Sequence, residues 1–201
     1  MSIKKAIHTA TLIGILLLSC TTAYSSARQW ELDKAHASIY FTVDHIFSKV
    51  LGQFRDFTLE LAFDPADLSG SSLAVTIPVD SIDTGIPKRD KHLLSADFFD
   101  SKKFPEITFT STAISDAGDG LYDVAGTLTI KGQAYNLLLP LKLAGMAEHP
   151  AKKGTEVAGF NGSIVIDRLA HGVGNGKFHQ MGIVGKDVEV FVTFEVLDDK
   201  S

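Results

Sequence analysis

The polar residues best suited to chemistry in this sequence are Arg89, Asp90 and His92, which stand close together in a charged stretch. An arginine can bind a phosphate or a carboxylate through two parallel hydrogen bonds, so the cluster could receive the charged end of a ligand. Arg89 and Asp90 could instead pair with each other and anchor their segment on the rest of the fold. The sequence leaves both interpretations open.

Histidines form a second set of candidates. His171 and His179 flank a glycine-rich stretch at 172–176, but the sequence predicts no strand-then-helix context of the kind a phosphate-binding loop needs. His36 and His45 lie in one predicted strand, and counting alternate positions puts them on opposite faces, where they cannot share a metal ion. We therefore expect no metal site, and hydrogen-bonded roles at strand ends for these side chains.

No motif typical of an enzyme stands in a supporting context. The sequence holds no G-x-S-x-G pattern, no H-E-x-x-H pattern and no pair of carboxylates with suitable neighbours. We expect a protein that binds a ligand without transforming it and that needs no cofactor.

The segment 1–27 resembles a signal for export. Lys4 and Lys5 precede an apolar stretch whose centre lies at 11–18, and this stretch is shorter than the roughly twenty residues needed to span a bilayer. Small residues over 21–27 suit ordinary cleavage, which would leave a single domain over 28–201.

A lipid anchor is the alternative for this segment. Residues 17–20 (LLSC) resemble a lipobox, in which Cys20 would be lipidated. We therefore expect a periplasmic protein, or alternatively a lipoprotein held on a membrane and facing the periplasm. Cys20 is also the only cysteine, so the chain cannot form an internal disulfide.

The charge of the chain excludes one class of partner and disfavours another. The net charge is −5 and the basic residues are scattered, whereas a nucleic-acid site needs a concentrated basic surface. Anionic membranes are disfavoured for the same reason, so we expect membrane contact only through a lipid anchor. The sequence does not fix the oligomeric state, and a homodimer is one assembly to consider.

Period-two alternation of apolar residues dominates the chain after residue 28 and predicts about eight antiparallel β-strands. Lys131-Gly132 predicts a tight hairpin between two of them. Eight strands form either a closed barrel or a two-sheet sandwich, and the long strands with short connections favour the barrel. The alternation stops near 88–103, where apolar residues at helical spacing predict a short helical cap on one barrel end.

Phenylalanine is the main aromatic residue, with thirteen Phe against four Tyr and one Trp. Surface-binding proteins favour Tyr and Trp, whose polar groups suit an interface, so most of these rings must face inward. They could fill a solid core or line a cavity for a chain-like ligand. Composition does not separate the two.

Motifs along the whole domain resemble those of the YceI-like, or polyisoprenoid-binding, family. Each motif is weak alone, but their order and spacing together are specific. They are WELD at 30–33, IYFTVDH at 39–45, GQF at 52–54, SIDT at 81–84, RDKHL at 89–93, FFD at 98–100, FPEITF at 104–109 and GTLTIKG at 126–132. The sequence departs from the family near its carboxyl end, where 168–174 reads RLAHGVG in place of Arg followed by Asp-Phe-Gly.

The resemblance implies a lipocalin-like barrel, exported to the periplasm, that holds a polyisoprenoid, an isoprenoid quinone or a fatty-chain amphiphile for transport, storage or stress protection. A hydrolase or isomerase using the same cavity, with Arg89 or His92 in its machinery, is the alternative function. A structural stress protein with a solid core is a third. The expected ligand-binding residues are Phe41, His45, Phe54, Phe57, Ile77, Arg89, Asp90, His92, Phe98, Phe109 and Arg168.

Overall fold

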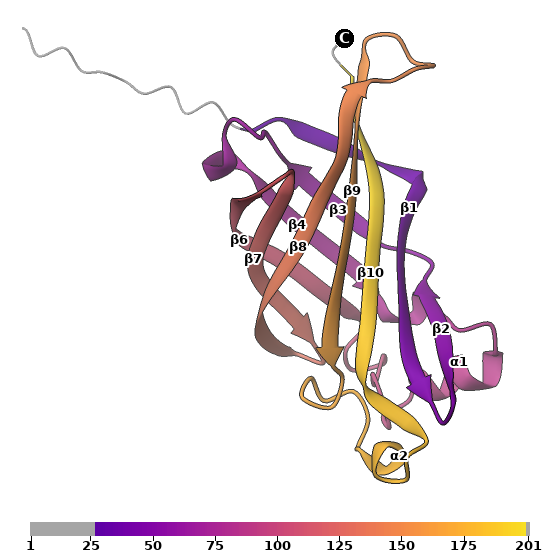
Figure 1. Ribbon diagram of the computed structural model, residues 1–201. Coiled ribbons are helices and arrows are strands. Elements are labelled where there is room, and N and C mark those ends of the chain that lie inside the picture. The colour runs from indigo at the N-terminus through magenta and orange to yellow at the C-terminus, as the bar shows by residue number, and fades with distance from the viewer. Residues whose placement is uncertain (1–26, 200–201) are drawn as a thin grey trace, which may run out of the picture.

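The computed structural model describes residues 27–199, which form one closed antiparallel β-barrel (Figure 1). Ten strands make a single sheet, and the first strand also pairs with the last, which closes the sheet. Residues 1–26 of the predicted signal segment, Cys20 included, lie outside the described residues. The strands are β1 (Gln29–His45), β2 (Ser48–Phe54), β3 (Thr58–Ala62), β4 (Ser72–Pro78), β5 (Ile82–Asp83), β6 (Glu106–Gly118), β7 (Leu121–Ile130), β8 (Gln133–Glu148), β9 (Thr155–Asp167) and β10 (Val184–Asp199).

The ten strands occupy the eight positions that the alternation predicts, because two of these positions hold interrupted strands. β2 and β3 both pair with β1 and are separated only by 55–57. β4 and β5 are separated by one 3-10 turn, Val79–Ser81. Since β2 pairs with β5 as β3 pairs with β4, each interrupted pair counts as one position in the ring. The predicted eight-stranded barrel is confirmed.

Two-residue turns connect the hairpins in the middle of the chain. Lys131 and Gly132 join β7 to β8 with φ angles of 51° and 72°. Positive φ at both central positions defines the type I′ turn, whose twist matches that of paired strands. The predicted hairpin at Lys131-Gly132 is confirmed, and Asp119-Gly120 makes the same connection between β6 and β7, with φ of 53° and 71°.

Side chains fill the barrel end that carries residues 27 and 199. The Phe63 ring lies 5.0 Å from that of Tyr122 and 5.3 Å from that of Phe160, measured between centroids. The Trp30 indole Nε1 donates a hydrogen bond of 2.9 Å to the Phe63 carbonyl oxygen. All four side chains are buried, so rings fill the interior of the barrel at this end. We call this the filled end.

Two short helices cover the opposite end, which we call the capped end (Figure 1). α1 (Pro87–Leu93) begins with a proline, whose missing N–H costs nothing in the first turn. Turns continue from α1 to residue 103, so the helical cap predicted near 88–103 is confirmed. Among residues 27–199, no helix has the length and apolar character needed to cross a bilayer.

α2 (Lys177–Gln180) corrects one expectation from the sequence. It follows the glycine-rich stretch at 172–176, which therefore does lie between a strand, β9, and a helix. The prediction of no such context was wrong, because a helix of a single turn is too short to produce a periodic pattern. A helix of a single turn has only a small dipole with which to attract an anion. The expectation of no phosphate site therefore remains a prediction.

Candidate functional site

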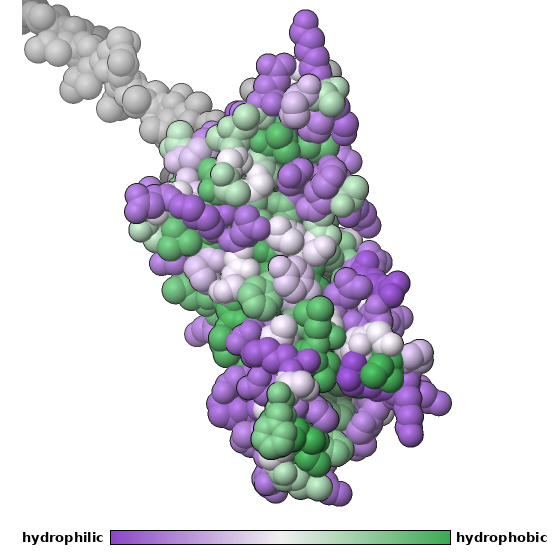
Figure 2. All heavy atoms as spheres, turned by 45° about the vertical axis from the view of Figure 1, so that its right-hand side comes forward, coloured by the Kyte–Doolittle hydropathy of each residue, from purple (hydrophilic) through white to green (hydrophobic). Residues whose placement is uncertain are grey.

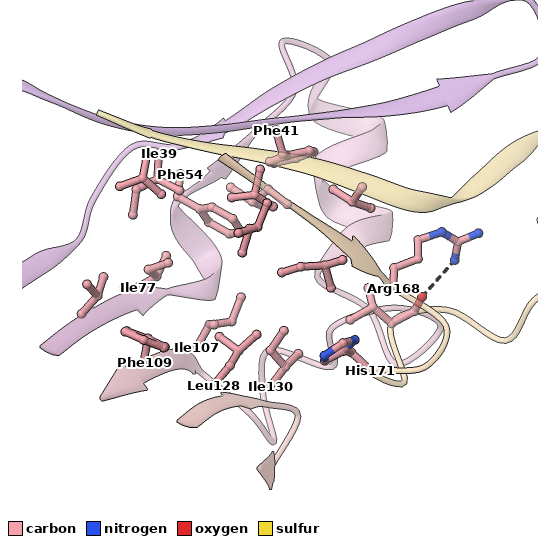
Figure 3. A pocket seen from close by; sticks show the side chains of 18 of the residues that line it. Ile39, Phe41, Phe54, Ile77, Ile107, Phe109, Leu128, Ile130, Arg168 and His171 are labelled. Atoms are coloured by element: carbon pink, nitrogen blue, oxygen red, sulfur yellow. Dashed lines mark hydrogen bonds between the residues drawn. The ribbon is translucent and has the colours of Figure 1, made fainter. Parts of the chain in front are cut away.

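The capped half of the barrel is hollow. It encloses a cavity of about 210 Å³, shown from close by in Figure 3. Every residue that lines it is apolar except Arg168 and His171. The apolar lining residues are Ile39, Phe41, Val43, Phe54, Leu59, Leu73, Val75, Ile77, Ile82, Leu93, Phe98, Phe99, Ile107, Phe109, Leu128, Ile130, Leu137, Leu139, Ile164, Ile166, Val173, Val184, Val188, Val190, Val192 and Phe194.

Strand β10 shows how the hollow half passes into the filled half. Val188, Val190 and Val192 line the cavity and are only half-buried. Farther along the strand, Phe194 and Val196 are 1% and 0% exposed. Apolar cavities of about 150 Å³ lined by aliphatic and aromatic side chains stay dry and take up apolar molecules. The interior is therefore solid at one end and suited to an apolar occupant at the other.

The structure divides the eleven expected ligand-binding residues into two groups. Six of them line the cavity, and five do not. Because no ligand is present, contact with a ligand remains a prediction for all eleven. The lining group is Phe41, Phe54, Ile77, Phe98, Phe109 and Arg168, and the other group is His45, Phe57, Arg89, Asp90 and His92.

Two residues of the second group lie on the framework of the barrel. Phe57 is buried in the core just before β3 and is 7% exposed. His45 is the last residue of β1 and is half-buried, and its carbonyl oxygen accepts a hydrogen bond from the Ser48 hydroxyl, 3.2 Å away. Both therefore hold local structure outside the cavity wall.

Arg89 and Asp90 hold α1 on the barrel through a shared partner, Thr84. The Arg89 guanidinium donates to the Thr84 hydroxyl and to its carbonyl oxygen, both at 2.7 Å. The Asp90 carboxylate accepts hydrogen bonds from the Thr84 backbone N–H and from its hydroxyl. These hydrogen bonds anchor α1, as one of the two interpretations of the sequence expects. They run through Thr84, however, and not between Arg89 and Asp90.

His92 lies on the outer side of the same cap. Its imidazole Nε2 lies at hydrogen-bond distance, 3.2 Å, from the Asp97 carboxylate, and the ring packs edge-on against the Phe98 ring, which itself lines the cavity. Phe178 from α2 stacks on Phe98, with the ring centroids 6.3 Å apart, and its ring centroid lies 6.1 Å from that of His92. Neither Arg89 nor His92 reaches the cavity, so an enzyme that depends on them would have to act elsewhere.

Arg168 supports the loop at the capped end of the cavity. The residue is 7% exposed, and its guanidinium donates hydrogen bonds to the carbonyl oxygens of Val173 (2.9 Å), Val184 (3.4 Å) and Gly185 (2.8 Å). Burial lowers the pKa of Arg168, and the neighbouring Asp167 carboxylate opposes this shift. Figure 3 shows the stem of the side chain at the cavity edge and the guanidinium turned toward the loop.

Gly174 leaves room for the Arg168 guanidinium within the loop 168–174. Its φ is 91°, and a Cβ added there would lie 2.5 Å from Arg168 Nη1. A side chain at this position would therefore push the guanidinium out of place. The departure from the family pattern at 168–174 still forms a compact support for the buried arginine.

His171 is the polar residue of the lining that the sequence did not identify as a ligand contact. Its Nδ1 lies 2.8 Å from the Asp167 carbonyl oxygen, and its ring is 4.2 Å from that of Tyr135. Because a carbonyl oxygen only accepts, Nδ1 carries the proton in this bond, which leaves Nε2 of the neutral ring as an acceptor. The one signal in the sequence was its position in the same loop as Arg168.

A bulge in β1 interrupts the alternation by which counting assigned His36 and His45 to opposite faces. The pairing with β10 shifts register between Asp33 and Ala37 and again between Val43 and His45, so alternation does not carry through the strand. His36 instead lies at the filled end, exposed, with ligand atoms of Asp33 and Glu195 within 4.8 Å. This group is separate from the cavity.

Known proteins share both the sequence pattern and the fold. Residues 30–196 match the YceI-like domain. Protein YceI of Salmonella arizonae is 34% identical over 194 residues, which cover 94% of this chain and 98% of that protein. The crystal structure of BcnA from Burkholderia cenocepacia is 31% identical, with a TM-score of 0.72 over 84% of this chain and 99% of its own.

A more distant structure shares the fold alone. It is a polyisoprenoid-binding domain from Saccharophagus degradans, 16% identical, with a TM-score of 0.57 over 85% of this chain and 98% of its own. The family match spans almost the entire barrel, and the relative from Salmonella aligns over nearly its full length. The chain belongs to the YceI-like family.

Proposed function

We propose that this protein binds one isoprenoid or similar amphiphilic chain inside the barrel and holds it without chemical change. The observation that carries the proposal is the lining of the cavity, which is apolar apart from Arg168 and His171. Membership of the YceI-like family and the shared fold of a polyisoprenoid-binding domain favour an isoprenoid among apolar chains.

The size of the cavity limits how much of such a chain it holds as it stands. A cavity of about 150 Å³ holds one benzene ring, so by proportion 210 Å³ holds about eight carbon atoms. Burial contributes about 0.8 kcal/mol per methylene, or about 6 kcal/mol for this length before ordering costs. A longer chain binds more tightly only if the cap side chains Leu93, Phe98 and Phe99 move to extend the cavity.

The orientation of the ligand follows from the two ends of the barrel. The filled end offers no exit, because Trp30 and Phe63 are buried among other rings there. The polar residues Arg168 and His171 lie at the capped end of the cavity. We therefore place the apolar tail toward the filled end and the polar group beside His171 Nε2.

Native extraction tests the proposal directly. Protein purified without detergent is extracted with organic solvent, and the extract is analysed by mass spectrometry. We expect an isoprenoid in stoichiometric amount. An extract without isoprenoids, quinones or fatty amides would contradict the proposal.

A matched pair of variants assigns the ligand to the cavity. Val190→Phe adds a ring to a half-buried side chain in the lining, whereas Val165→Phe adds the same ring to a side chain that is 65% exposed on the outside of β9. We expect Val190→Phe to lose the extracted ligand and Val165→Phe to keep it. Equal retention would place the ligand elsewhere.

We also propose that the protein is exported to the periplasm, where it carries or stores its ligand or protects it during stress. The support is the charged and apolar pattern of the segment 1–27. Fractionation of cells, with mass spectrometry of the mature amino terminus, separates ordinary cleavage from lipidation of Cys20. A full-length chain in the cytoplasm would contradict export.

A further inference from the structure

The β1–β2 hairpin ends in two apolar residues that nothing in the described chain covers. Phe47 is 101% exposed and Ile46 is 56% exposed. The Ile46 backbone N–H donates to the Ile183 carbonyl oxygen at 3.0 Å, which ties the hairpin to the turn after α2, where Met181 is 59% exposed. We call Ile46, Phe47 and Met181 the apolar tip.

The backbone conformation of Ile46, within the apolar tip, is energetically unfavourable for this residue type. Its φ is 54°, in the left-handed region, where a β-branched side chain is a rare outlier. Asparagine or glycine would form the same turn with less strain. Local folding therefore does not explain an isoleucine followed by a fully exposed phenylalanine, which points to a use outside the barrel.

Charge is divided between the two ends of the barrel. The segments at the capped end, 44–51, 84–104, 131–132 and 167–187, hold ten Lys or Arg and six Asp or Glu. The rest of residues 27–199 holds six basic and eighteen acidic residues. These segments sum to +4, and the adjoining Asp83, Glu106 and Glu189, the last paired with Lys49, reduce the capped end to about +1, against about −9 for the rest of residues 27–199.

Exposed lysines lie on the helical cap at the same end of the barrel as the apolar tip. Lys88 and Lys91 on α1, Lys102 after it and Lys177 on α2 are all exposed, and none of the four forms an ion pair with another described residue. Figure 2 shows apolar residues at the surface of this lower end among hydrophilic ones. Apolar side chains that project from a basic surface suit the interface of an anionic bilayer, where lysine is attracted and phenylalanine is buried.

We propose that the apolar tip inserts into an anionic lipid bilayer and places the capped end of the barrel against the membrane. Phe47 then enters the boundary between headgroups and acyl chains, with the lysines above it at the phosphates. The cavity lies at the same end, so a ligand drawn from the bilayer would cross the cap without crossing water. The docking itself does not depend on which ligand the cavity holds.

Vesicle flotation of the full chain tests this proposal. The vesicles contain phosphatidylcholine alone or phosphatidylcholine mixed with phosphatidylglycerol. We expect binding to the anionic vesicles, weakened by added salt because the lysine attraction is screened, and little binding to the neutral ones. Phe47→Ser should reduce the partition coefficient at least about tenfold, the scale set by burying a phenylalanine side chain.

Leu138→Ser is the matched control, since it removes an apolar side chain that is 54% exposed on β8, outside the tip. It should bind vesicles like the wild type. Failure of the wild type to bind anionic vesicles, or unchanged binding by Phe47→Ser, would overturn the proposal. Loss of a dimer in Phe47→Ser, with no vesicle binding by the wild type, would assign the tip to contact between copies.

Ligand retention separates this proposal from the proposed function. Phe47 does not line the cavity, so Phe47→Ser should keep its extracted ligand while it loses vesicle binding. Val190→Phe should do the reverse. A wild-type extract without ligand, together with intact vesicle binding, would contradict the cavity proposal and leave the docking surface standing.

Discussion

Arg168 brings a positive charge to the edge of an apolar cavity, and three backbone carbonyl oxygens hold it there. Arg168→Met keeps the length of the stem but leaves these buried acceptors without their donor. Hydrogen bonds to charged groups contribute about 1.5–3 kcal/mol, so we expect the free energy of unfolding to fall by about 3 kcal/mol in urea denaturation. Arg55→Met is the control, because it removes an exposed ion pair to Asp83 worth less than about 1 kcal/mol. Similar losses in both variants would refute the buried role.

His36 and Asp33 form a second, exposed pair whose titration can be measured. The hydrogen bond and the charge of Asp33 raise the pKa of His36 above its ordinary value of 6.5, and the same bond lowers the pKa of Asp33. We expect NMR titration to find the raised pKa of His36 in the wild type and a lower pKa in Asp33→Asn. Because the folded-state pKa of His36 is raised, its small stabilising contribution is complete below 6.5 and is lost as the pH rises through the raised pKa. A pKa that does not change in Asp33→Asn would refute the pair.

At the scale of elements, the close pairing of β6 and β7 depends on a glycine. A Cβ at Gly126 would lie 2.5 Å from both Phe109 Cζ and the Thr110 carbonyl oxygen. The second contact is with backbone, which cannot turn aside, so Gly126→Ala must push the two strands apart. We expect a loss of about 1–3 kcal/mol in the free energy of unfolding, the usual range for overpacking.

Gly145→Ala provides the comparison on β8. Its added Cβ would meet no atom within 4 Å, so we expect a change within about 0.5 kcal/mol. Chemical denaturation of both variants measures the difference. Equal losses in the free energy of unfolding would show that the space around the added methyl group does not determine the size of the loss.

At the scale of the whole molecule, the filled and hollow ends should differ in stability. Amides beside the buried rings at the filled end, near Phe63 and Phe160, should exchange only when the whole barrel unfolds, whereas those of 87–104 should exchange through local opening of the cap. Geraniol, a short isoprenoid alcohol, should slow exchange in the cap, because it binds only the closed barrel. Hydrogen exchange with mass spectrometry measures both. Uniform exchange, with no response in the cap, would contradict a cap that moves during binding.

The sequence by itself determined the strands, the Lys131-Gly132 turn, the helical cap and the family. These depend on local rules: side chains alternate along a strand, and two residues with positive φ close a hairpin. It also identified part of the cavity lining, since inward alternation selects Phe41 and Phe109 whatever their partners are. Counting is not reliable past the bulge in β1, because extra residues change the face of the side chains that follow without a clear mark in the sequence.

Only the tertiary structure decided that one half of the barrel is filled and the other hollow. Phe63 and Phe54 follow the same pattern in the sequence, yet one packs among rings from distant strands and the other faces the cavity. The difference depends on the summed volume of side chains from strands far apart in the chain. In the same way, only the folded chain brings exposed lysines of α1, of the turns after it and of α2 together at one end of the barrel, which the net charge alone does not show.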